Sequence, residues 1–180
     1  MVGAGVEGES FNRPTDVGWD AQGNIFVSDG YGNSRVVKYD KNGVFLKMTG
    51  HRGNGPGEFN TPHGLAMDAK GNVYIADRGN NRIQVLDNDL NFKTQYVNVG
   101  TPWTVCITPG PNPVLFTSDS YPGRIYKLSL DGKLLGVLGK SGKQPKQFGW
   151  IHEIACPSEN LLYVAEQLNW RVQKLMLHPR

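Results

Sequence analysis

The chain has 180 residues, enough for one domain with a core of its own. Its 23 glycines and 11 prolines are spread evenly, which is typical of turn-rich structure. The formal net charge is +3 with no block of like charges, which argues against a nucleic-acid-binding face. No apolar run approaches the roughly 18 residues of a membrane-spanning helix, and the first ten residues lack the apolar core of a signal peptide. We therefore expect neither nucleic acid nor a membrane as a partner.

The sequence repeats itself four times. A unit that begins at Phe11 returns 48 residues later at Phe59, and more diverged copies begin at Thr101 and Phe148. In the first two copies the matched positions are Pro14 with Pro62, Asp20 with Asp68, Gly23 with Gly71, and Asp29 with Asp77. Self-similarity at a fixed period indicates a repeat architecture.

Each copy is predicted to hold several short strands. In the first copy they cover residues 16–19, 24–29, 35–40 and 44–50, and the fourth of these strands is also visible in the second and third copies. The turn after the first strand reads Asp-Ala-Gln/Lys-Gly-Asn in the first two copies, and its glycine can take the positive φ that a tight hairpin needs. Four short strands per roughly 45 residues predict an all-β fold, a β-propeller.

We predict a single propeller domain over residues 1–180. Its four blades are expected at about 11–58, 59–100, 101–147 and 148–180. The first ten residues resemble the loop that precedes a blade, so we expect the ring to be truncated at its N-terminus. An open arc leaves two apolar blade faces in water, and such faces are association sites. We therefore expect either a longer natural protein or self-association through the exposed blade faces.

An acidic residue and an arginine recur at fixed places in every copy. The second strand ends on an acidic residue and the third begins on an arginine; the pairs are Asp29 and Arg35, Asp77 and Arg82, Asp119 and Arg124, and Glu166 and Arg171. Because every copy has the pair, we assign it to the scaffold, as an ion pair that fixes the turn or bridges blades.

The two cysteines, Cys106 and Cys156, lie in apolar strand contexts. We expect two buried free thiols. A disulfide would form only if the two strands were neighbours with suitable geometry. Two cysteines do not decide the redox compartment.

Two histidines break the repeat pattern. At the entry of the first strand the four copies carry Thr15, His63, Trp103 and His152. A lone histidine is more often structural than a ligand, but two at equivalent positions of alternate blades point to a metal. Imidazole suits zinc, so His63 and His152 are candidate zinc ligands. The other two histidines, at positions 51 and 178, are expected to be solvated.

The repeats resemble NHL repeats, on the motif Pro-x-x-(V/L/I)-A-x-D, G-N-(V/I)-Y-V-A-D and N-x-R-(I/V)-Q. More narrowly, the chain is similar to the C-terminal four blades of the peptidyl-α-hydroxyglycine α-amidating lyases, which are six-bladed, zinc-containing propellers. The stretches that carry this resemblance are 27–39, 57–68, 75–85 and 148–155. The resemblance implies a six-bladed ring of which two N-terminal blades are absent here.

The resemblance also implies a reaction, the cleavage of a peptidyl-α-hydroxyglycine to a peptide amide and glyoxylate. The third zinc-binding histidine would lie in the missing blades, so this chain alone should bind zinc poorly; calcium is a second metal that the resemblance allows. Tyr31 would act on the substrate hydroxyl, and the alternative is a surface aromatic residue in a turn. Arg78 would hold the substrate carboxylate, and the alternative is a surface ion pair. Glu153 stands where the family has Asp and could still orient the site.

Other departures and rival functions stay open. Gly32 and Tyr74 stand where the animal enzymes have disulfide cysteines. The alternative function is a non-catalytic NHL propeller that binds a protein, peptide or glycan on its loop face, with RNA as a weaker third candidate. The expected partner is accordingly a peptide-like small substrate or a peptide. An extracytoplasmic location is implied by the resemblance alone.

Overall fold

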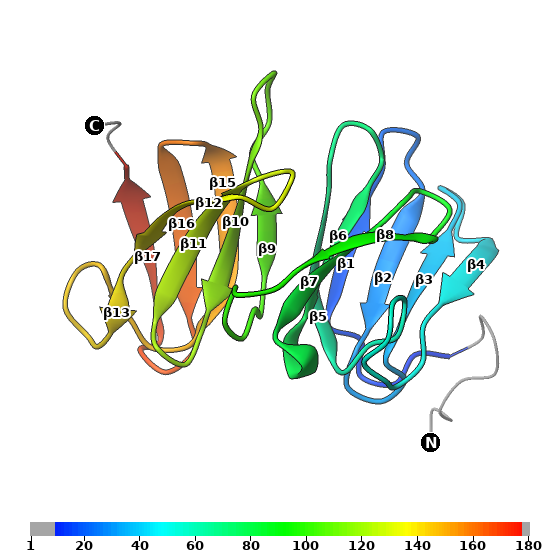
Figure 1. Cartoon of the computed structure of the whole chain (residues 1–180), viewed down its shortest axis with the longest axis horizontal. Helices are drawn as coiled ribbons and strands as arrows, with labels where there is room; N and C mark the ends of the chain where they lie inside the picture. Colours follow the sequence, from blue (N-terminus) through cyan, green and yellow to red (C-terminus); the bar gives the residue numbers. More distant parts are fainter. Residues whose placement is uncertain (1–9, 178–180) are drawn as a thin grey trace.

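The structure, a computed structural model, describes residues 10–177. It is built from antiparallel sheets that stand side by side as blades (Figure 1). Three blades have four strands each and the last has three, so the all-β propeller fold is confirmed. In the described part of the chain, helix is limited to one 3-10 turn, η1 (Arg78–Asn80). None of the described helices is long and apolar enough to cross a membrane.

The strands of each blade follow one another in the chain. Blade 1 holds β1 (Asp16–Trp19), β2 (Ile25–Asp29), β3 (Arg35–Tyr39) and β4 (Phe45–Thr49). Blade 2 holds β5 (Pro62–Met67), β6 (Val73–Asp77), β7 (Arg82–Leu86) and β8 (Phe92–Tyr96). Blade 3 holds β9 (Val105–Ile107), β10 (Val114–Asp119), β11 (Arg124–Ser129) and β12 (Leu134–Leu138). Blade 4 holds β15 (Ile151–Ser158), β16 (Leu161–Glu166) and β17 (Arg171–Met176), after a short parallel pair, β13 (Lys140–Ser141) and β14 (Gln147–Phe148).

The turn between the first two strands of blade 1 is fixed by its own aspartate. One carboxylate oxygen of Asp20 accepts hydrogen bonds from the backbone N–H groups of Gln22 and Asn24, at 3.0 and 2.8 Å. Gly23 has a φ of 84°, a left-handed conformation that glycine adopts without steric cost. Asp68 repeats the arrangement in blade 2. The recurring Asp-x-x-Gly-Asn motif is therefore a hairpin device.

Apolar side chains fill the space between successive blades. Phe59 and Ile75 are fully buried in the cluster between blades 1 and 2, Leu115 in the cluster between blades 2 and 3, and Phe148 and Leu162 in the cluster between blades 3 and 4. The first strands, β1, β5, β9 and β15, contact one another in that order. The site residues predicted on these strands therefore approach one another.

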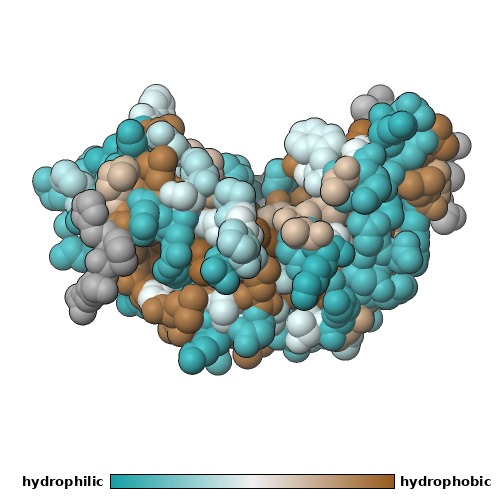
Figure 2. All heavy atoms as spheres, turned by 90° about the horizontal axis from the view of Figure 1, so that it is seen from above, coloured by the Kyte–Doolittle hydropathy of each residue, from teal (hydrophilic) through white to brown (hydrophobic). Residues whose placement is uncertain are grey.

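The outer faces of the first and last blades are open. Seen from above, the molecule is a crescent with a notch between its two halves (Figure 2). Trp19 on β1 is 60% exposed, and Val172 and Met176 on β17 are 65% and 55% exposed. The exposed apolar faces are thus present; self-association through them and the six-bladed ring stay predictions.

The expectation of two free thiols is wrong. Cys106 on β9 and Cys156 on β15 form a disulfide, with their Cα atoms 6.1 Å apart. These two strands are the first strands of neighbouring blades and contact each other, which is the condition a disulfide requires. The bond therefore ties blade 4 to blade 3.

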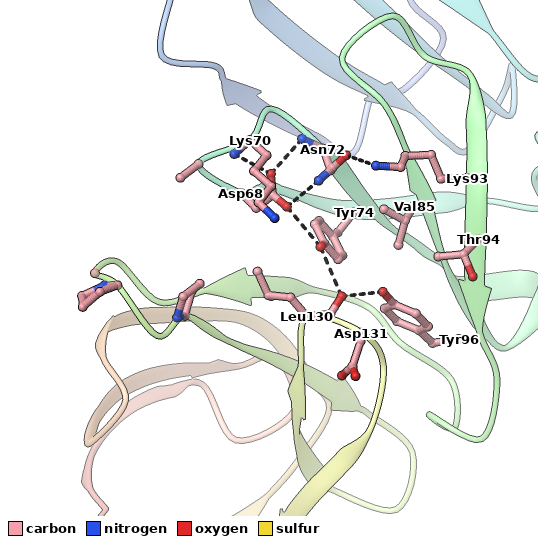
Figure 3. A pocket seen from close by; sticks show the side chains of 14 residues that line it. Asp68, Lys70, Asn72, Tyr74, Val85, Lys93, Thr94, Tyr96, Leu130 and Asp131 are labelled. Carbon is pink, nitrogen blue, oxygen red and sulfur yellow. Dashed lines mark hydrogen bonds between the residues drawn. The ribbon is translucent and has the colours of Figure 1, made fainter.

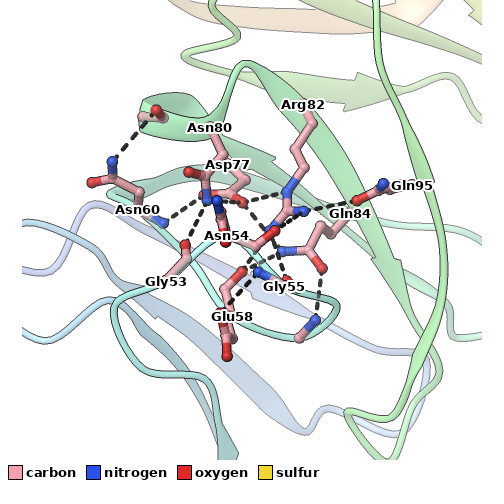
Figure 4. Close-up of polar contacts among 12 residues, drawn as sticks. Gly53, Asn54, Gly55, Glu58, Asn60, Asp77, Asn80, Arg82, Gln84 and Gln95 are labelled. Carbon is pink, nitrogen blue, oxygen red and sulfur yellow. Dashed lines mark hydrogen bonds and ion pairs between the residues drawn. The ribbon is translucent and has the colours of Figure 1, made fainter.

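The recurring carboxylate–arginine pair fastens the linker that precedes its blade. In blade 2, Arg82 Nε donates to Asp77 at 2.8 Å, and the other guanidinium nitrogens donate to the linker carbonyls of Asn54, Gly55 and Glu58 at 2.7 to 2.9 Å (Figure 4). Both partners are buried. The pair therefore joins the blade to its linker rather than only closing a turn.

The pair forms in blades 1, 2 and 4 but not in blade 3, so the expectation that every copy makes it is wrong. Arg124 is exposed, and Asp119 instead accepts hydrogen bonds from Thr101 N and the hydroxyl of Tyr126. The linker into blade 3 is short, because β8 ends at Tyr96 and blade 3 begins near Thr101. It lacks the long glycine-rich loop whose carbonyls hold the arginine in blades 2 and 4.

Candidate functional site

The predicted site residues gather at one end of the blades. Tyr31 lies in the β2–β3 loop and Arg78 in η1, while His63 lies near the start of β5 and His152 near the start of β15. Glu153 follows His152 on β15. Starts of first strands and second-to-third-strand loops share one end of a propeller blade, which explains why distant residues meet here.

The two histidines lie against each other. Their ring centroids are 5.0 Å apart at an interplanar angle of 73°. His63 Nδ1 lies 2.8 Å from the carbonyl oxygen of Trp103. A carbonyl only accepts, so Nδ1 carries the proton and the Nε2 of a neutral ring is left with a free lone pair. Nε2 faces the hydroxyl of Tyr31, 3.3 Å away.

A directed chain of hydrogen bonds crosses the site. Arg78 Nη1 donates to the Tyr31 hydroxyl oxygen at 3.3 Å, and this hydroxyl donates to His63 Nε2. The guanidinium also covers two rings, 5.2 Å from the centroid of Tyr31 and 4.4 Å from that of Trp103. No carboxylate of the described residues lies within ion-pair distance of Arg78. The surface ion pair considered for Arg78 is therefore not formed, and the cation is available to an anionic ligand.

Burial keeps both histidines uncharged. Burial is the largest cause and lowers the pKa of His63 to about 4. The hydrogen bond to Trp103 raises this pKa, and the positive charge of Arg78 lowers it further. Burial and then Arg78 also lower the pKa of His152, while Asp16 opposes the shift. Neutral imidazole is the form that binds a metal or accepts a hydrogen bond.

Two carboxyl groups flank the histidines. Glu153 Oε1 accepts hydrogen bonds from the Thr104 hydroxyl and Ile154 N, and Asp16 Oδ2 accepts one from Leu65 N at 2.8 Å. Burial of the carboxyl group raises the pKa of Asp16. It also raises the pKa of Glu153, whose carboxyl group is buried even though Glu153 as a whole is an exposed residue. The sequence reasoning missed Asp16. Asp16 follows Thr15 as Glu153 follows His152, so the alignment of the repeats places the two carboxylates at equivalent positions.

The geometry suits two ligands of a zinc ion. With Zn–N bonds near 2.0–2.1 Å, two imidazoles on one tetrahedral ion have centroids about 5 Å apart. The hydrogen bond from His63 Nδ1 to a backbone carbonyl is the outer-shell support that metal-ligating histidines usually have. Catalytic zinc usually takes three protein ligands, and within residues 10–177 no group of three or more His, Cys, Asp or Glu is arranged to hold a metal. The described residues thus hold no complete metal site.

Trp103 is the centre of the site, and the sequence reasoning used it only as a repeat position. Its ring lies 5.2 Å from His63 and 5.5 Å from His152. Its indole N–H is buried without an acceptor, which costs about 1–3 kcal/mol. Such a group in a folded protein calls for an explanation.

A separate cleft lies between blades 2 and 3, at the other end of β6 (Figure 3). Its volume is about 610 Å³, and Tyr74 and Tyr96 line it. The Tyr96 hydroxyl donates to the carbonyl oxygen of Leu130 at 2.6 Å, and the Tyr74 hydroxyl lies 3.2 Å from a carboxylate oxygen of Asp68 and 3.4 Å from the same carbonyl. Burial raises the pKa of both phenols. The tyrosines therefore hold the two blades together, and the cleft contains none of the predicted site residues.

His51 is exposed in its loop, as expected, and lies 3.3 Å from Glu58. The last histidine, at position 178, lies outside the described residues.

Comparison with known proteins identifies the repeat. The model of the NHL repeat family matches residues 11–39 and 59–86, which span the first three strands of blades 1 and 2. The chain is a β-propeller whose first two blades carry NHL repeats. This NHL propeller is 38% identical over 120 residues to NHL repeat-containing protein 3 of Mus musculus, covering 65% of the chain and 33% of the mouse protein.

A second relative spans nearly the whole propeller. Peptidyl-glycine alpha-amidating monooxygenase A of Xenopus laevis is 31% identical over 175 residues, covering 90% of the chain and 19% of that protein. Among solved structures, virginiamycin B lyase of Staphylococcus aureus superposes with a TM-score of 0.64 at 14% identity, over 93% of this chain and 57% of that one. This last likeness shows the fold alone. The NHL propeller thus spans about a third and about a fifth of the two curated relatives.

Proposed function

We propose that this NHL propeller has the site of a lyase that cleaves peptidyl-α-hydroxyglycine to a peptide amide and glyoxylate. The observation that carries the proposal is the chain from Arg78 through the Tyr31 hydroxyl to His63 Nε2. It sets an acid–base group between an unpaired cation and the neutral imidazole of His63, against which the second imidazole lies. The similarity to an amidating protein of Xenopus laevis supports the same reaction.

The reaction needs one proton moved and one bond broken. The Tyr31 oxygen acts as base after its own proton has passed to solvent, and it takes the proton of the substrate hydroxyl; the O–H electrons form the carbonyl of glyoxylate, and the C–N bond breaks toward nitrogen. The nitrogen takes this proton from Tyr31 and leaves as the primary amide, which restores the base. Arg78 donates to the Tyr31 oxygen and so stabilises the negative charge that this oxygen carries as a base. Its remaining donors can hold the glycine carboxylate.

His63 and His152 would hold zinc, which would supply Lewis-acid chemistry when bound. Zinc on His63 would occupy the Nε2 lone pair that accepts from the Tyr31 hydroxyl in this structure, so the hydroxyl would then be free to act on the substrate. Glu153, held by Thr104, would orient the strand end that carries His152. Calcium prefers oxygen ligands, which Asp16 and Glu153 offer. With two of three zinc ligands in the chain, we expect weak zinc binding and low activity.

The first test measures zinc binding by titration of the purified chain, together with cleavage of an N-acylated α-hydroxyglycine. Zinc binding by the wild type that is lost in His63→Ala and His152→Ala, together with slow release of glyoxylate, supports the proposal. The matched control is His51→Ala, because His51 is exposed and outside the site. Zinc binding that persists in both site variants contradicts the metal assignment, and cleavage that persists in Tyr31→Phe contradicts the role of Tyr31.

A second candidate function is a non-catalytic propeller that binds a peptide on its loop face. The exposure of Tyr31 beside the unpaired Arg78 favours it, since an accessible aromatic ring and a free cation form a binding surface without any metal. Peptide binding that is unaffected by zinc chelation, with no glyoxylate released, would select this function.

A further inference from the structure

Three aromatic side chains form a continuous surface beside the candidate site; we call Trp103, Tyr121 and Trp150 the aromatic platform. Trp103 lies 5.7 Å from Trp150 and 6.2 Å from Tyr121, and the last two rings are 5.8 Å apart. Trp103 is buried, Trp150 is half-buried, and Tyr121 is 55% exposed. The platform therefore has a buried base and an accessible edge.

The platform is joined directly to the site. The buried Trp103 contacts His152 with its ring and is covered by the guanidinium of Arg78 at 4.4 Å. Beyond Tyr121 and Trp150 lies a hollow of about 240 Å³, which Leu168 also lines. A ligand held at Arg78 thus has an apolar surface and a hollow beside it.

The repeat scaffold does not require these aromatic residues. The positions equivalent to Trp150 hold Arg13 in blade 1 and Thr61 in blade 2, and all three residues adopt a positive φ between 54° and 58°. The backbone conformation is therefore common to the repeat, whereas the indole belongs to blade 4 alone. The position equivalent to Tyr121 in blade 1 is Tyr31, which is itself in the candidate site.

The unpaired indole N–H of Trp103 is a second, independent observation. Trp103 is 5% exposed, and its nitrogen has no acceptor in the described structure. Buried donors are nearly always paired, and the exceptions need a reason. An acceptor on a ligand, such as a peptide carbonyl, would satisfy this donor once the rings around it shift.

We propose that the aromatic platform binds the side chain that precedes the reacting glycine, and that the substrates are peptides with an aromatic or large apolar residue there. This inference rests on the proposed function, because it places the terminal carboxylate at Arg78. Arg78 lies 4.4 Å from the Trp103 ring, and Trp150 and Tyr121 lie 5.7 and 6.2 Å from that ring. One residue of backbone spans at most about 3.6 Å, so a large side chain is needed to extend from a carboxylate at Arg78 to Trp150 and Tyr121. Aromatic pairs gain from edge-to-face contact of the kind that Tyr121 already makes with Trp103 and Trp150.

The experiment compares two unreactive probes, N-acetyl-Phe-Gly and N-acetyl-Ala-Gly, by isothermal titration calorimetry with the purified chain. We expect the Phe probe to bind about tenfold more tightly than the Ala probe. Trp150→Ala and Tyr121→Ala should remove this preference while leaving the Ala probe's affinity unchanged. Trp150→Phe, which keeps an aromatic ring, should retain it. Trp170→Ala is the matched control, because Trp170 is 92% exposed and outside the platform.

The outcomes separate this inference from the proposed function. Equal affinity for the two probes, no binding of either, or a preference that survives in both alanine variants overturns the platform's role. Glyoxylate release without a preference for the Phe probe contradicts the role of the platform and supports the lyase function. A preference for the Phe probe supports a peptide-binding platform. If N-acyl-Phe-α-hydroxyglycine then releases no glyoxylate, the lyase function is contradicted. Circular dichroism melting of each variant shows that a lost preference is not lost folding.

Discussion

Nδ1 of His63 donates a hydrogen bond to the carbonyl oxygen of Trp103, 2.8 Å away, and this bond crosses from blade 2 to blade 3. It fixes the tautomer of a candidate metal ligand and joins that residue to the segment that leads into β9 of the next blade. The site and the packing of the blades are therefore coupled, so changes in one should be measurable in the other.

The stability of the chain should fall between pH 7 and pH 5 because of His63. Its pKa is about 4 in the folded chain and about 6.5 when unfolded, so below pH 6.5 the unfolded chain binds the extra proton. The contribution of the neutral ring is fully present above pH 6.5 and is lost as pH falls toward 4. Urea unfolding should show a loss of about 2 kcal/mol between pH 7 and pH 5 that His63→Gln lacks. Equal losses in the two proteins would contradict the assignment.

The fold and the closeness of the candidate site residues could be predicted from the sequence because both follow from the repeat. Once His63 and His152 occupy equivalent positions of alternate copies, the propeller itself brings them together, and their 5.0 Å separation follows from packing of the first strands. Tyr31 and Arg78 lie in equivalent loops of adjacent blades and meet for the same reason.

What the sequence could not supply depends on distances between copies. The disulfide forms because Cys106 and Cys156 lie on neighbouring strands, with their Cα atoms 6.1 Å apart. Neither cysteine has a counterpart in the other blades, so the repeat pattern does not reveal this closeness. The missing ion pair of Arg124 depends on the shortness of the linker before it. The central role of Trp103 appears only when the rings around it are placed in space.

Removing Arg82 should destabilise the chain, whereas removing Arg124 should not. Arg82→Ala leaves the buried Asp77 without its cation and frees three linker carbonyls, for a loss of about 3 kcal/mol in the free energy of unfolding. Arg124 occupies the same repeat position but is exposed and unpaired with Asp119, so Arg124→Ala should change stability by less than about 0.5 kcal/mol. Denaturant unfolding of both variants measures the difference. Similar losses would show that the pair is not what fastens the linker.

Removing the disulfide should loosen blade 4. The bond joins residues 50 apart in the sequence, and closing a loop of that length in the unfolded chain corresponds to about 4 kcal/mol. We expect the Cys106→Ser, Cys156→Ser double variant to lose about 2–4 kcal/mol, with the largest rise in amide hydrogen exchange on β15 to β17. Wild-type chain treated with reductant should behave like the variant. An exchange pattern that rises equally in all blades would contradict a local tie.

Gly64 should not tolerate even a methyl group. A Cβ at this position would lie 2.6 Å from the Cα of Thr104 and 2.8 Å from the carbonyl oxygen of Trp103, so Gly64→Ala must push β9 away from β5. We expect a loss of about 1–3 kcal/mol in the free energy of unfolding, typical of overpacking. That carbonyl is also the acceptor of His63 Nδ1, so the pKa of His63 should move and NMR titration of its ring should report the change.

The matched control is Gly136→Ala on β12. Gly136 has no positive φ, and a Cβ there would meet nothing within 4 Å. Its stability should stay within about 0.5 kcal/mol of wild type or rise slightly, because alanine restricts the unfolded chain. If Gly64→Ala were as harmless as Gly136→Ala, the first strands of blades 2 and 3 could not be as close as described. The hydrogen bond between His63 and Trp103, which depends on that approach, would then need another explanation.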